Sequence, residues 1–62
     1  MNELMVVYSD GWVYFKTSET DVIRARDAYY KALRNAGIDY SNHPVKEMIL
    51  RDEYYDDIGK LS

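Results

Sequence analysis

The sequence predicts a small α+β protein in which an N-terminal β-hairpin is followed by two α-helices, a ββαα order. A turn-forming dipeptide between two β-rich runs indicates the hairpin. Capping and terminating residues then bound a first helical segment, and a proline suited to a first helical turn opens a second. With 62 residues the chain forms one small domain, residues 1–62, whose core is marginal unless further surface is buried. We therefore expect homodimerisation to complete the fold.

The hairpin is expected over residues 4–17. The runs LMVVYS and WVYFKT favour strands, and Asp10-Gly11 between them suits the positive φ angles of a two-residue turn. This register places Val7 opposite Tyr14. Alternation gives a core face with Leu4, Val6, Tyr8, Val13 and Phe15, and a second face with Met5, Val7, Ser9, Trp12, Tyr14 and Lys16.

The first helix is expected over residues 19–36. Ser18 with Asp21 three residues later is a capping pattern at its start. Gly37 suits the left-handed position after a helix, and Ile38 can fold back on the last turn in a Schellman ending. The apolar stripe that should face the core holds Val22, Ala25, Tyr29, Ala32, Leu33 and Ala36.

A second helix is expected over residues 44–57, followed by a short C-terminal tail. Pro44 favours the first turn of a helix and disfavours helical angles at the residue before it. The helical wheel then carries two apolar sides rather than one. The first side holds Val45, Met48, Ile49 and Tyr55, and the second holds Leu50 and Tyr54. One side can serve the chain's own core, so the other requires cover from another surface.

The segment RDEYYDD, residues 51–57, closes this second helix, and a similar segment, RDAYYKA, residues 26–32, lies in the first. The shared RDxYY pattern is compatible with an internal duplication, although a match this short also arises by chance. We interpret the carboxylates of the second segment as a solvated helix face rather than a metal site, because one helix face presents too few ligands for a hard cation.

Composition excludes several classes of protein. The chain has no cysteine, which rules out disulfides and Cys-containing zinc sites. The longest apolar run, Leu4–Tyr8, is too short to span a bilayer, and the N-terminal residues lack the features of a secretory signal. We therefore expect a cytoplasmic protein with no membrane partner.

No arrangement of residues indicates an enzyme. His43 is the only histidine, and no nucleophile or carboxylate is placed beside it by the sequence. The three glycines are widely scattered, so there is no glycine-rich phosphate-binding loop. We expect no catalytic residues, no metal and no cofactor.

The expected function is protein binding by a small intracellular adaptor or regulator that acts as a homo-oligomer. Seven tyrosines favour surfaces that are alternately wet and buried. The partners are a second copy of the chain, most simply in a homodimer, and an unidentified protein. The expected interface residues are Val7, Trp12, Tyr14, Leu50 and Tyr54.

Nucleic-acid binding is the alternative function. Trp12 and Tyr14 could stack on bases, while the helix residues Arg24, Lys31 and Arg34 could contact phosphates. The net charge of −3 opposes general binding to nucleic acid. Residues 22–37 hold four basic side chains and one acidic, and residues 47–57 hold five acidic and one basic, so mutual attraction also accounts for the basic stripe. A metal- or substrate-binding domain is the third alternative.

Overall fold

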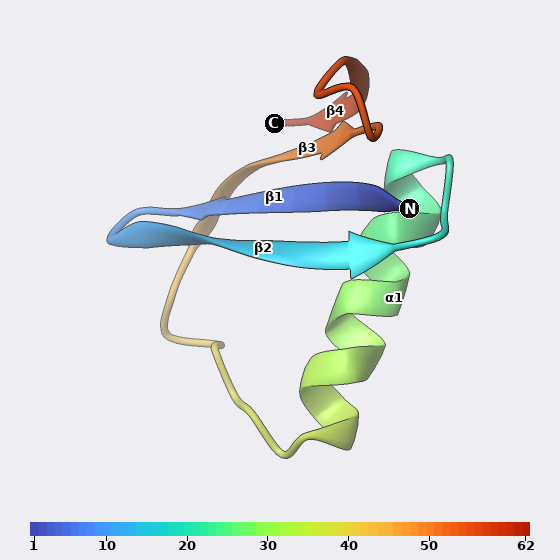
Figure 1. The fold of residues 1–62 in the computed structure, drawn as a ribbon. Coiled ribbons are helices and arrows are strands. Elements are labelled where there is room, and N and C mark those ends of the chain that lie inside the picture. The colour runs from blue at the N-terminus through green and yellow to red at the C-terminus, as the bar shows by residue number, and fades with distance from the viewer.

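The computed structural model describes all 62 residues and has one helix packed on a four-stranded antiparallel sheet (Figure 1). The elements in chain order are β1 (Asn2–Tyr8), β2 (Gly11–Thr17), α1 (Val22–Asn35), β3 (Val45–Arg51) and β4 (Asp57–Leu61). The strand order in the sheet is β2-β1-β3-β4. Because β2 and β3 both pair antiparallel with β1, they run parallel to each other, and α1 connects them across β1 in a split βαβ arrangement.

The predicted second helix over residues 44–57 is wrong, and with it the ββαα order. These residues form β3, a turn and the start of β4. Met48 and Leu50 face the core with 2% and 0% of their surface exposed, whereas Ile49 between them pairs with Met5 on the opposite face. The strand therefore regroups the residues of the expected helical wheel: Met48 and Leu50, expected on different sides of a helix, share the core face, because strand side chains alternate with a period of two.

The segment RDEYYDD forms the β3–β4 turn. The carboxylate of Asp52 accepts hydrogen bonds from the backbone N–H groups of Tyr54 at 2.8 Å and Asp56 at 3.0 Å. Tyr55 donates its N–H to the Asp52 carbonyl and adopts a φ of 65°, a left-handed conformation that is uncommon for so bulky a residue. The similar segment at residues 26–32 lies in α1, so the two RDxYY segments are not structural repeats.

The predicted N-terminal hairpin is present, but its register differs from the expected one. Val7 pairs with Trp12 rather than with Tyr14, so the two-residue loop is Ser9-Asp10. The shift is by two residues, and therefore every strand side chain stays on its predicted face. The N–H of Ser9 donates to the Pro44 carbonyl at 3.2 Å, a contact with a distant loop that the local turn pattern does not contain.

The helix begins later than expected and ends as expected. Asp21, not Ser18, is the N-cap, because its carboxylate accepts from the Ile23 N–H at 2.9 Å. Gly37 adopts a φ of 71°, and the N–H of Ile38 donates to the carbonyl of Leu33 at 2.9 Å. The predicted Schellman ending is therefore confirmed.

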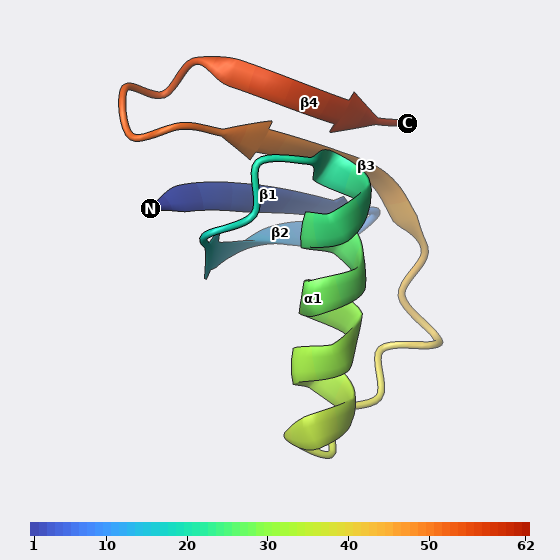
Figure 2. The same cartoon turned by 90° about the vertical axis from the view of Figure 1, so that its right-hand side faces the viewer.

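The core lies between α1 and one face of the sheet, which we call the inner face. Figure 2 shows α1 crossing the strands steeply. The buried apolar residues are Leu4, Val6, Tyr8, Ala25, Tyr29, Met48 and Leu50. Only eight of the 62 residues are buried, so the core supplies little stabilisation by itself. No helix is long and apolar enough to cross a bilayer.

A pair of tyrosine hydroxyls lies inside this core. The Oη atoms of Tyr8 and Tyr29 are 2.7 Å apart, so one hydroxyl donates to the other. Burial raises the pKa of both phenols above the ordinary tyrosine value, because the phenolate would lose its hydration. The pair satisfies both polar atoms while their rings remain in the apolar interior.

Close packing between α1 and β4 depends on Gly59. A Cβ atom placed on Gly59 would lie 2.8 Å from the Cβ of Val22 in the first turn of α1. This distance is shorter than side-chain carbons tolerate. The glycine therefore allows the start of the helix to rest directly on β4.

We predict that Gly59→Ala lowers the free energy of unfolding by roughly 1–3 kcal/mol, the usual cost of overpacking. The penalty should shrink in a Val22→Gly background, because that change removes the Cβ atom that the alanine meets. Urea unfolding of the two single variants and the double variant measures this coupling. Additive effects of the two changes would contradict the close contact.

We predict that stability is constant from about pH 7 to pH 9 and falls as the pH rises above about 10, the ordinary tyrosine pKa. The raised pKa of Tyr8 and Tyr29 in the folded state means that the unfolded chain releases its phenolic protons first. Rising pH then favours unfolding. Urea unfolding at several pH values across this range measures the free energy of unfolding. The double variant Tyr8→Phe/Tyr29→Phe should lose less of it at alkaline pH than Tyr54→Phe, the control variant that removes an exposed phenol. Equal alkaline losses would contradict the account.

Candidate functional site

The sheet face opposite α1 is not covered by any element of the chain. We call it the open face and define it by the strand residues that alternate with those of the core. They are Glu3, Met5, Val7, Trp12, Tyr14, Lys16, Glu47, Ile49, Arg51, Asp57 and Lys60. Because α1 is the only helix, this face meets solvent in the single chain.

The centre of the open face is apolar. Met5 pairs with Tyr14 on one side and with Ile49 on the other, so these three side chains form one row across the sheet. Val7 and Trp12 pair in the next row. Trp12 and Tyr14 are 61% and 54% exposed, whereas the other three side chains are half-buried. The aromatic side chains of Trp12 and Tyr14 thus project beyond the smaller apolar side chains of Met5, Val7 and Ile49.

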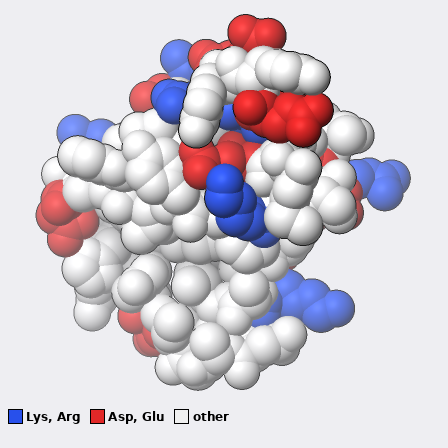
Figure 3. Space-filling view, viewed as in Figure 1, with Lys and Arg blue, Asp and Glu red and all other residues white.

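Three ion pairs surround this apolar centre. They join Lys16 to Glu3 at 3.3 Å, Arg51 to Asp57 at 3.4 Å, and Lys60 to Glu47 at 3.4 Å. Solvent-exposed pairs of this kind contribute about 0–1 kcal/mol each to stability. Because these pairs contain three cations and three anions, the open face carries no net charge. Figure 3 shows acidic and basic side chains interleaved around the strands rather than one large field of a single sign.

Three of the five predicted interface residues lie together on the open face, namely Val7, Trp12 and Tyr14. Leu50 is fully buried on the inner face, so its predicted place at an interface is wrong for the folded chain. Tyr54 lies in the β3–β4 turn and is 76% exposed. Both residues were expected on the uncovered side of a second helix, and the chain has no second helix.

The residues expected to bind nucleic acid are divided between two sides of the molecule. Arg24, Lys31 and Arg34 are exposed on α1, which covers the inner face. Trp12 and Tyr14 stand on the open face. No single surface therefore combines the expected base-stacking residues with the expected phosphate contacts.

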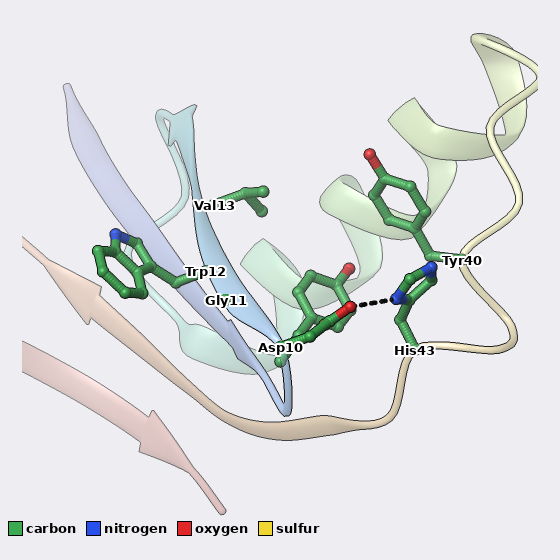
Figure 4. A pocket seen from close by; sticks show the side chains of 7 residues that line it. Asp10, Gly11, Trp12, Val13, Tyr40 and His43 are labelled. Carbon is green, nitrogen blue, oxygen red and sulfur yellow. Dashed lines mark hydrogen bonds and ion pairs between the residues drawn. The ribbon is translucent and has the colours of Figure 1, made fainter.

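A second candidate site lies beside the hairpin turn, where the loop between α1 and β3 returns to the sheet. We call it the aromatic corner and define it by Tyr8, Asp10, Tyr40 and His43. Nδ1 of His43 lies 2.9 Å from Oδ2 of Asp10. The dashed line in Figure 4 marks this contact. A cavity of about 240 Å³ opens here, lined also by Gly11, Trp12 and Val13. The Trp12 ring points away from the other labelled side chains of this cavity.

Sequence reasoning did not find the aromatic corner. Asp10 was assigned only to the turn, and His43 was expected in a loop without a carboxylate partner. The two residues are 33 positions apart, and only the path of the loop brings them together. Within that loop, the N–H of Ser41 donates to the Asp39 carboxylate at 2.9 Å and holds the pKa of Asp39 below its usual range.

The metal-ligand groups of the chain do not converge. No three side chains among the histidine, aspartate and glutamate residues are placed together in a way that could hold a metal ion.

Comparison of the chain with protein-family models, with curated proteins and with solved structures finds no match in any of the three.

Proposed function

We propose that the protein is a small adaptor or regulatory protein of the cytoplasm that binds other proteins through the open face of its sheet, and that its first partner is a second copy of the same chain. The observation that carries this proposal is the position of Trp12 and Tyr14, each more than half exposed above the row formed with Met5 and Ile49. Exposed aromatic side chains within an apolar surface are typical anchors of protein interfaces.

The charge distribution favours a second copy over a strongly charged partner. The whole chain carries a net charge of −3, so two copies repel each other weakly at long range. The open face itself is neutral, because its three ion pairs cancel. Approach through this face therefore places no surplus of like charge at the contact.

A twofold axis through the open face gives a closed assembly. In such a dimer the same patch is buried on both subunits, and growth stops at two copies. Two sheets packed face to face lie about 10 Å apart, with the side chains of both faces forming one layer. Trp12 and Tyr14 would enter that layer, which would enlarge the apolar core of a chain that buries only eight residues by itself.

The nucleic-acid alternative has less support, because its stacking and basic residues lie on opposite sides of the sheet. The open face also carries Glu3 and Glu47, whose carboxylates would meet phosphates unfavourably.

We predict that the wild-type chain sediments as a dimer at micromolar concentration and that Trp12→Glu and Tyr14→Glu shift it to a monomer near 7.3 kDa. A buried unpaired carboxylate at the dimer contact would weaken association by at least about tenfold in the dimer dissociation constant. Sedimentation equilibrium measures this shift, and circular dichroism verifies that each variant keeps its fold.

Tyr54→Glu is the matched control, since it introduces the same charge at an exposed tyrosine outside the open face. It should leave the dimer intact. A folded wild-type monomer, or a dimer that Tyr54→Glu disrupts and Tyr14→Glu does not, would refute the proposed contact.

A further inference from the structure

The aromatic corner has a geometry that the protein-binding function leaves unused. The rings of Tyr8, Tyr40 and His43 lie with their centroids 5.6–6.4 Å apart and with interplanar angles of 75–82°. The planes of the three rings are therefore nearly perpendicular to one another. A group seated between them would lie within about 6 Å of each centroid, the range of cation–π attraction.

Asp10 supplies the only carboxyl group among the residues that line this cavity. Its carboxylate is exposed and is held in place by His43 through the 2.9 Å contact between Oδ2 and Nδ1. No lysine or arginine lines the cavity. The cavity therefore presents one carboxylate beside three aromatic rings, on a chain whose net charge of −3 also attracts cations.

The three rings are positioned by different parts of the fold. Tyr8 ends β1 and is fixed by the hydrogen bond between its hydroxyl and that of Tyr29. Tyr40 and His43 belong to the loop after α1, and a turn bond from the His43 N–H to the Tyr40 carbonyl at 2.9 Å sets their spacing. The corner is thus formed in the free chain, so a ligand would not have to organise it.

We propose that the aromatic corner binds an alkylammonium group, with Asp10 as the counter-ion and the rings of Tyr8, Tyr40 and His43 as the walls of the site. The cavity of about 240 Å³ is below the range of drug-sized ligand sites, roughly 300–1,000 Å³, and so suits a compact head group such as a methylated ammonium. The cavity shares Trp12 with the open face, but the proposed binding groups, Asp10 and the rings of Tyr8, Tyr40 and His43, are not among the open-face residues, so the proposal does not depend on the dimer.

The test uses choline and its neutral isostere 3,3-dimethylbutan-1-ol, each titrated into the isotope-labelled protein at pH 8 and followed by backbone amide chemical shifts. We expect saturable shifts around Asp10, Tyr40 and His43 with choline, and binding of the neutral isostere at least about tenfold weaker.

Asp10→Asn keeps a turn-forming residue and removes the charge, and Tyr40→Leu keeps an apolar side chain and removes the ring. Each should weaken choline binding by roughly tenfold. Tyr54→Leu is the control for loss of a tyrosine and should bind choline as the wild type does. Tyr14→Glu should also bind normally, whatever its effect on the dimer.

Equal affinities for choline and the neutral isostere, unchanged affinity in Asp10→Asn, or no saturable shifts would overturn the proposal. A free small molecule and a protein side chain can both supply the ammonium group. A short peptide containing trimethyl-lysine distinguishes them, since tighter binding of the peptide than of choline indicates a protein ligand, and the reverse indicates a free one. Either result supports the site.

Discussion

The central constraint on the structure is that the chain has only one helix to cover a sheet of four strands. A single helix covers one face of the sheet, and α1 contacts all four strands through that face. The opposite face is left to solvent although its centre carries Met5, Trp12, Tyr14 and Ile49. Antiparallel sheets with one solvated face usually alternate apolar and polar residues cleanly. Here the alternation places apolar residues on both faces, and this excess is the physical basis of the proposed docking surface.

Local patterns predicted the parts of the fold that local interactions determine. The N-terminal hairpin, its two faces, and the Schellman ending at Gly37 all depend on neighbouring residues. The prediction of a second helix was wrong because a short apolar run fits a helix or a buried strand equally well. The deciding interaction is the pairing of β3 with β1, whose partner residues lie 37 to 48 positions earlier in the chain, and no local pattern records it.

The same distinction applies to the candidate sites. Alternation alone placed Val7, Trp12 and Tyr14 on one face of the sheet, since a two-residue error in register does not change the face of a side chain. Leu50 and Tyr54 were expected together on one side of a second helix, but Leu50 is buried in the core and Tyr54 lies in the β3–β4 turn. The aromatic corner was missed altogether, because it requires the loop after α1 to bring His43 back to the hairpin turn, where it meets Asp10 and completes the three-ring arrangement with Tyr8.

The central claim, that a second copy covers the open face, is tested most directly by an isotope-filtered NOE spectrum of a mixture of labelled and unlabelled chains. Packing of two open faces predicts intermolecular NOEs among the side chains of Met5, Trp12, Tyr14 and Ile49, since facing sheets interdigitate in one layer. The buried Leu50 and the turn residue Tyr54 should give none. Intermolecular NOEs confined to α1 or to the β3–β4 turn, or a complete absence of them in a protein that sediments as a monomer, would contradict the account.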